Sequence, residues 1–185
     1  MIEPFPIYQV DAFTSRPFTG NPAGVCLPGR PMADAWHLAV AREMNLSETA
    51  FLLPRQDGWG LRWFTPQVEV ELCGHATLAS AHILWETERC QRDQLIRFHT
   101  LSGELHARWL DGWIELDLPL RPVVEMALPV SVSRALGGHP GAVRRAGWGE
   151  LLHRNCQPGG CAGGPAGPCL AADPAGSRVD RHRPR

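Results

Sequence analysis

The chain of 185 residues contains no lysine, and all 18 of its basic residues are arginine. This absence excludes Schiff-base chemistry and the phosphate-binding lysine of a P-loop. No stretch approaches the roughly 20 apolar residues of a membrane-spanning helix, and residues 1–10 lack the pattern of a secretion signal. The formal net charge of −1 argues against a protein that coats nucleic acid. We therefore expect a cytoplasmic protein whose partner is a small molecule, not nucleic acid or membrane.

The sequence also has few plausible metal ligands at familiar spacing. Six cysteines are unevenly spread, and free thiols are the expectation in a chain with no secretion signal. Cys73 and His75 form a C-x-H pair, which offers fewer ligands than a zinc site needs. The remaining set consists of His153, Cys156, Cys161 and Cys169, whose intervals match no common zinc finger. We expect neither a metal nor an organic cofactor.

Hydrophobic periodicity predicts more strands than helices. Residues 33–44 have apolar side chains at helical spacing with Asn45 as a left-handed cap, and a second helix of small and apolar residues begins at about Gly74. Alternating or apolar runs predict strands over residues 6–13, 23–27, 49–53, 60–64, 68–72, 95–100, 103–109 and 113–118. Several of these runs are separated by short turn sequences that favour hairpins. The pattern indicates a mixed α+β fold with mostly antiparallel pairing.

The composition changes near residue 144. Of residues 144–185, 13 are glycine or proline, and the segment has no sustained period of two or 3.6. Such a segment buries too little apolar surface to offset its chain entropy. We expect a folded domain over residues 1–120, the start of a second domain over 121–143, and a disordered tail over 144–185.

Glu48 is the first candidate for chemistry. It lies where a capped helix gives way to an apolar strand, so its carboxylate would enter or flank the core. A partly buried carboxylate is a usable general base near neutral pH. From spacing alone, a strand-end glutamate that faces water is the more common outcome.

His75 is the second candidate, at the start of the helix of small residues. The free N–H groups of a helix N-terminus can hold a substrate carboxylate, and the same field favours a neutral imidazole that can pass a proton. Gly74 would allow a ligand to approach the backbone closely. The alternative is structural: His75 caps the helix and Gly74 makes the turn.

Cys73 is a third candidate. A helix N-terminus lowers the pKa of a thiol, so Cys73 could act as a base. A buried small hydrophobic role is the more common fate of a lone cysteine. Both interpretations stay open at the level of the sequence.

Three segments, VDAFTSRPFTGNPAGV, NLSETAFLL and RWFTPQVEVELCGHATLASAHIL, resemble in this order the phenazine-biosynthesis-like isomerases of the PhzF family. The resemblance covers about residues 5–140. It implies a fold like that of diaminopimelate epimerase, with two similar α+β domains, each a sheet curled around a central helix, and the active site between them. The helix that begins at Gly74 would be the central helix of the first domain.

The resemblance also implies roles for individual residues. Glu48, in the S-E-T motif, would be the catalytic acid/base, and His75, in G-H-A-T, would line the site beside it. Gly74, Ala76 and Asn21 would help to hold the substrate. The implied reaction is cofactor-independent isomerisation of a small carboxylated substrate, such as a dihydro-hydroxyanthranilate, by proton transfer. The family is often dimeric, so a homodimer is possible.

Two other functions remain open. Related racemases use a cysteine base near the position of Cys73, which implies an amino-acid racemase or epimerase as an alternative. A non-catalytic module that binds small acids or a partner chain is another. The chain also departs from the family, because the D-P-x-T-G-S-A-like motif of the second domain is absent. We expect a second domain that is largely missing, a tail produced by truncation or frameshift, and impaired activity.

Overall fold

The computed structural model describes residues 4–119, 123–126, 134, 143–146, 151–153 and 178–182. The chain divides into two compact units, one formed by Met1–Pro119 with Ser177–Arg185 and the other by Leu120–Gly176. The domain boundaries expected near residues 120 and 143 remain predictions, and most of the tail expected to be disordered lies outside the described residues. No helix in the described part of the chain combines the length and apolar character needed to cross a bilayer.

The first unit is built on one nine-stranded sheet. Its strands are β1 (Ile7–Ala12), β2 (Asn21–Cys26), β3 (Thr49–Arg55), β4 (Gly58–Phe64), β5 (Glu69–Val70), β6 (Ile96–Thr100), β7 (Gly103–Leu110), β8 (Trp113–Leu118) and β12 (Arg178–His182). The order across the sheet is β1-β2-β3-β4-β6-β7-β8-β12, and β5 pairs with β4. Only the β2/β3 and β4/β6 pairs are parallel among these strands. The predicted α+β class with mostly antiparallel pairing is confirmed.

The structure shortens one predicted strand. The run over residues 68–72 forms only the two-residue strand β5. The backbone N–H and the hydroxyl of Thr65 both donate to the Val68 carbonyl, which closes a turn before the strand.

In the second unit, β9 (Val123–Met126), β10 (Val143–Ala146) and β11 (Leu151–His153) form a three-stranded antiparallel sheet in the order β11-β10-β9.

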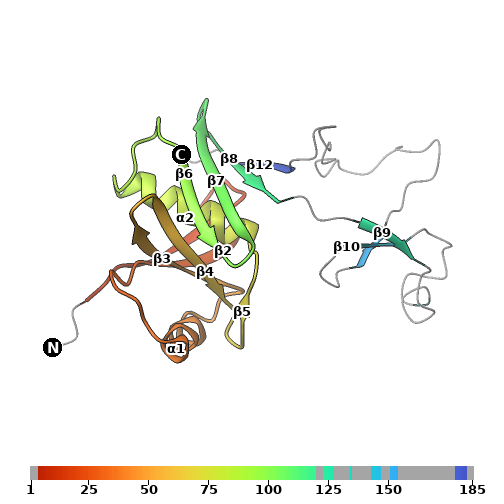
Figure 1. Cartoon of the computed structure of the whole chain (residues 1–185), viewed down its shortest axis with the longest axis horizontal. Helices are drawn as coiled ribbons and strands as arrows, with labels where there is room; N and C mark the ends of the chain where they lie inside the picture. The colour runs from red at the N-terminus through yellow and green to blue at the C-terminus, as the bar shows by residue number, and fades with distance from the viewer. Residues whose placement is uncertain are drawn as a thin grey trace. The chain divides into compact units, whose positions relative to one another are not determined.

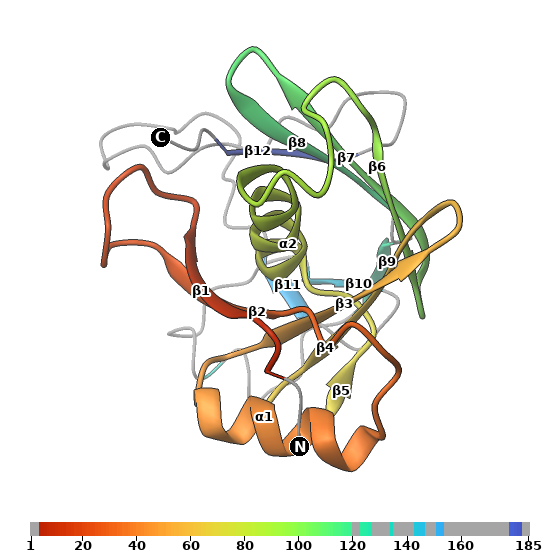
Figure 2. The same cartoon turned by 90° about the vertical axis from the view of Figure 1, so that its left-hand side faces the viewer.

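Helix α2 (Gly74–Glu86) lies inside the curl of the large sheet (Figure 2). Nine of its 13 residues are buried, because a helix that is apolar on all sides must be covered on all sides. Small side chains such as Ala76 and Ala79 let the surrounding strands approach. The hydroxyls of Thr77 and Ser80 donate to the carbonyls of Cys73 and Ala76 at 2.6 and 2.7 Å, so their burial leaves no unpaired polar group.

Helix α1 (Asp34–Met44) packs on the outer face of the same sheet (Figure 1). A second small core forms there between Ala41 of the helix and Phe51 and Phe64 of β3 and β4. The helix ends at Asn45, which has a φ of 51° and donates its backbone N–H to the Ala41 carbonyl. The predicted left-handed cap is therefore confirmed, and it turns the chain toward the start of β3.

A close contact between β2 and β3 fixes where β3 begins. The two strands are parallel, with Gly24 opposite Thr49. The Gly24 N–H donates to the Glu48 carbonyl at 3.1 Å. A Cβ on Gly24 would lie 2.9 Å from Thr49 Oγ1 and 3.0 Å from Thr49 Cγ2. No rotation of the Thr49 side chain removes both of its γ atoms from this contact, so the position requires glycine.

Gly24→Ala should therefore lower the free energy of unfolding by about 1–3 kcal/mol through overpacking. Urea unfolding followed by circular dichroism measures this change. Thr49→Ala removes both γ atoms, so the double variant should recover part of the loss. Equal destabilisation in the single and double variants would contradict the proposed contact.

Candidate functional site

Glu48 lies in the short connection between the C-cap of α1 and the first residue of β3. It follows the left-handed cap at Asn45 by three residues and directly precedes β3. Its own carbonyl accepts the hydrogen bond from Gly24. Its side chain is 21% exposed, so the carboxylate flanks the core and is not freely solvated.

His75 is the second residue of α2 and lies beside Glu48. Its side chain is 10% exposed, and its Nε2 is 3.4 Å from Glu48 Oε2. The Ser47 hydroxyl is also 3.4 Å from Nε2. The backbone carbonyl of Pro22 in β2 also acts on the ring and raises its pKa. The structure thus brings together the two residues on which the sequence interpretation depends.

Burial lowers the pKa of His75 from its ordinary value. The negative charge of Glu48 and the Pro22 carbonyl act in the opposite direction but do not outweigh burial. The ring is therefore neutral at pH 7. The sequence predicted a neutral ring because the positive end of a helix disfavours a charged imidazole. The structure gives a different main cause, which is the burial of the ring away from water.

Cys73 directly precedes α2 and lies beside the other ring nitrogen of His75. Its Sγ is 3.3 Å from His75 Nδ1, and the residue is 7% exposed. Burial raises the pKa of Cys73 to about 12, and the negative charge of Glu48 adds to this effect. The N–H groups of Ala76 and His75 act in the opposite direction but are outweighed. The expectation that the helix N-terminus lowers this thiol's pKa is therefore wrong.

Glu48, Cys73 and His75 form one cluster. One ligand-type atom from each residue can be chosen so that all three lie within 4.8 Å of one another. The cluster comes from two elements that are distant in the chain, the start of β3 and the start of α2. It can exchange protons, accept hydrogen bonds and, through sulfur, nitrogen and oxygen, bind a cation.

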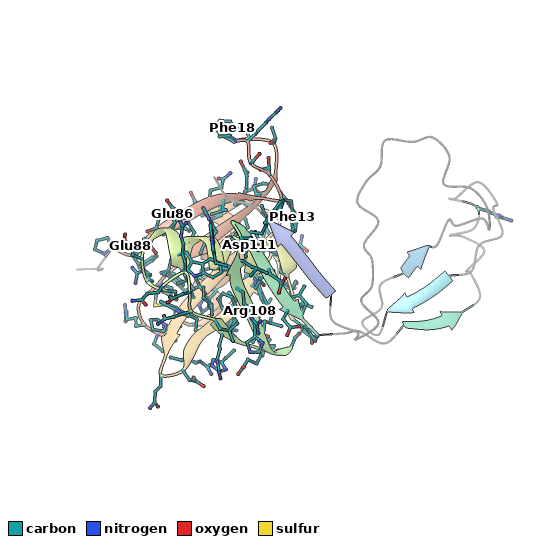
Figure 3. All side chains as sticks on the ribbon, turned by 90° about the horizontal axis from the view of Figure 1, so that it is seen from above. Phe13, Phe18, Glu86, Glu88, Arg108 and Asp111 are labelled. Atoms are coloured by element: carbon teal, nitrogen blue, oxygen red, sulfur yellow. The ribbon has the colours of Figure 1, made fainter. Side chains whose placement is uncertain are left out.

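Three further residues, Gly74, Ala76 and Asn21, were predicted to hold the substrate. Gly74 and Ala76 belong to the first turn of α2, where backbone N–H groups have no partner within the helix. Asn21 begins β2 and directly precedes Pro22. It is exposed, at the end of the β1–β2 loop, whose Phe18 projects from the body of the unit in Figure 3.

The sequence interpretation missed two groups, the Pro22 carbonyl and the Ser47 hydroxyl. Both lie inside segments that had already been singled out, GNPAG and NLSET. Ser47 precedes Glu48 directly, so its proximity could have been anticipated. The role of Pro22 had no signal in its side chain, because a backbone carbonyl makes the contact.

Comparisons with known proteins show which family and which fold this chain shares. The family model described as phenazine biosynthesis-like protein matches residues 10–137. An uncharacterized isomerase from Halalkalibacterium halodurans is 55% identical over 148 residues, which cover 80% of this chain and 56% of that relative. The crystal structure of a PhzF family phenazine biosynthesis protein from Enterococcus faecalis is 35% identical with a TM-score of 0.66, and covers 75% of this chain and 53% of that one. The chain spans about half the length of these relatives.

A more distant likeness concerns the fold alone. A hydroxyproline epimerase from Agrobacterium vitis is 14% identical with a TM-score of 0.55, covering 80% of this chain and 50% of that chain. The sheet curled around a central helix therefore extends beyond close relatives. Since the family model covers more than half of the residues, the chain belongs to the phenazine biosynthesis-like protein family.

Proposed function

We propose that this chain carries the acid/base half of a cofactor-independent isomerase that acts on a small carboxylated substrate. One observation supports this most directly: Glu48 Oε2 lies 3.4 Å from His75 Nε2 at the N-terminus of a buried helix. A carboxylate and a neutral imidazole at this separation can share one small substrate.

The first turn of α2 would hold the substrate carboxylate. The N–H groups of Gly74 and Ala76 have no partner within the helix and carry the partial positive charge of a helix N-terminus, which favours an anion. Asn21, at the start of β2, would add an amide at the rim of the site. Binding through the carboxylate would place a substrate carbon beside Glu48 and His75, where a proton can be removed and returned.

Glu48 would act as the general acid/base. It would take a proton from a carbon of the substrate and deliver it to another carbon, so the substrate is isomerised and the enzyme is unchanged. His75, neutral at pH 7, can donate a hydrogen bond from one ring nitrogen and accept one at the other. A dihydro-hydroxyanthranilate combines the required carboxylate with a mobile proton, and it is the substrate type that we propose.

The relatives place this proposal in context. The relative from Halalkalibacterium halodurans is called an isomerase, and this chain spans 56% of it. Activity of the whole protein, a homodimeric assembly and a cytoplasmic location are therefore parts of the proposal. A second domain would complete the site by covering the substrate and excluding water.

A cysteine-based racemase or epimerase is the second candidate. Its support is the distance of 3.3 Å between Cys73 Sγ and His75 Nδ1, together with the fold shared with a hydroxyproline epimerase. The pKa of about 12 counts against it, because a neutral thiol is a poor base. The carboxylate mechanism is therefore the better supported of the two.

Glu48→Gln keeps the shape of the side chain but removes the base. Deuterium incorporation from D₂O into a dihydro-hydroxyanthranilate should fall by about 10²–10⁴-fold. Glu43→Gln, on the exposed face of α1, is the matched control and should exchange like the unmodified chain. Equal exchange in the Glu48 and Glu43 variants would refute the mechanism. Binding of anthranilate-type acids in calorimetry without any exchange would favour a non-catalytic module.

The raised pKa of Cys73 predicts slow alkylation. Relative to the ordinary value of 9.0, a pKa of about 12 reduces the thiolate fraction at pH 8 by about 1,000-fold. Iodoacetamide should therefore label Cys73 in the folded chain at least about 100-fold more slowly than in the chain unfolded by urea. Peptide mapping by mass spectrometry gives both rates for the same residue. Fast labelling of the folded chain with complete loss of activity would favour the racemase.

The lowered pKa of His75 predicts a loss of stability in acid. Above the unfolded-state pKa of about 6.5 the ring is neutral in both states. As the pH falls below 6.5 and through the lower folded value, the unfolded chain binds the proton first and gains stability. When the pH is lowered from 7.5 to 5, the unmodified chain should therefore lose more unfolding free energy than His75→Gln, which has no group that titrates at this position. A difference that does not vary with pH would contradict the prediction.

A further inference from the structure

The cluster at the start of α2 contains more metal ligands than the sequence indicates. The C-x-H pair alone is too small for a zinc site, but the fold adds the carboxylate of Glu48 from the start of β3. Sulfur, imidazole nitrogen and carboxylate oxygen are the three ligand types that zinc uses in proteins. We infer that Glu48, Cys73 and His75 form a binding site for a borderline-soft divalent cation, with zinc as the best fit.

The distances are compatible with one tetrahedral ion. Zn–S bonds of about 2.3 Å and Zn–N or Zn–O bonds of about 2.0–2.1 Å place neighbouring ligand atoms roughly 3.3–3.6 Å apart. Cys73 Sγ is already 3.3 Å from His75 Nδ1. Glu48 Oε2 lies 3.4 Å from the other ring nitrogen, Nε2, so the carboxylate would turn toward Nδ1 to join the ion. All three ligand atoms can be taken within 4.8 Å of one another, so the Glu48 side chain would need to move by about 1–1.5 Å to reach the separation that one ion requires.

The surroundings of His75 support its use as a ligand through Nδ1. A metal-bound imidazole usually donates its other N–H to an oxygen, which fixes the ring. Here Nε2 has the Ser47 hydroxyl at 3.4 Å. Cys73 caps the N-terminus of a buried helix and His75 lies in its first turn, so two ligands are positioned before the ion arrives. The partly exposed Glu48 provides the third and adaptable ligand, and water would take the fourth position.

Binding requires one proton to leave. Cys73 is a neutral thiol, and formation of the S–Zn bond replaces its S–H bond while the proton goes to solvent. The thiolate and the carboxylate then balance the two positive charges of the ion. No change in oxidation state is involved, so zinc and cadmium need no further reactant.

Inhibition by zinc is expected only if the proposed isomerase function is correct, whereas zinc binding itself does not depend on that function. An ion on these ligands would occupy both Glu48 and His75. It would therefore inhibit the proposed isomerase, and a chelator would restore activity. If Glu48 proves irrelevant to catalysis, zinc binding at this cluster would still be measurable.

The test must separate this cluster from the thiols of residues 144–185. A background chain with Cys156→Ser, Cys161→Ser and Cys169→Ser removes those thiols. Zinc affinity is measured by competition with a chromophoric chelator, and cobalt(II) provides a second readout through its thiolate charge-transfer absorption. We expect one ion per background chain and a charge-transfer band.

Variants within the background then assign the ligands. Cys73→Ser should abolish the band, and both Cys73→Ser and Glu48→Gln should weaken zinc binding by at least about tenfold. Glu48→Gln keeps the sulfur and should retain the band. This variant therefore tests the site even if the Cys73 variant fails to fold. Cys90→Ser, which alters a thiol bonded to Trp59 Nε1 outside the cluster, should change neither readout. No stoichiometric binding to the background chain, or unchanged binding in either cluster variant, would overturn the inference.

Discussion

The parallel contact between β2 and β3 is the constraint on which the site depends. Gly24 lies so close to Thr49 that a larger residue would force the strands apart, and its N–H fixes the backbone of Glu48. Two residues earlier, the Pro22 carbonyl lies close enough to the His75 ring to raise its pKa. One short strand therefore positions both members of the pair, although Glu48 and His75 are 27 positions apart in the chain. The chemistry requires this common support, because a carboxylate and an imidazole act together only within hydrogen-bond reach.

Burial divides the chemical roles within the cluster. The same removal from water that keeps His75 neutral also keeps the Cys73 thiol protonated. A helix N-terminus would by itself favour the thiolate, but the local N–H groups do not overcome desolvation at a residue that is 7% exposed. Glu48, the most exposed of the three, is the member best placed to carry negative charge. This difference in exposure explains why we favour the carboxylate over the sulfur as the base.

Much of the first unit could be predicted from periodicity and turn chemistry. Both helices begin within a residue or so of the predicted positions, and the cap at Asn45 was readable from its residue type. The predicted strand over residues 68–72 was too long, because a turn at Thr65–Val68 intervenes. The proximity of Glu48 and His75 came from family resemblance and not from spacing. No local pattern could indicate the Pro22 carbonyl, the loss of thiol acidity on burial, or a third ligand beside the C-x-H pair, since each depends on contacts between distant segments.

Helix α2 serves at once as the centre of the core and as the edge of the site. At a rise of about 1.5 Å per residue, its 13 residues form a rod roughly 20 Å long. Because α2 is rigid and enclosed by strands, a shift of its buried central residues would also displace its first turn, where His75 lies. Changes of substrate preference on this scaffold should therefore arise in the exposed β1–β2 loop beside Asn21, which can vary in sequence without disturbing the rod. The β1–β2 loop could then change the preferred ligand, while α2 and the strands around it preserve the hydrophobic core.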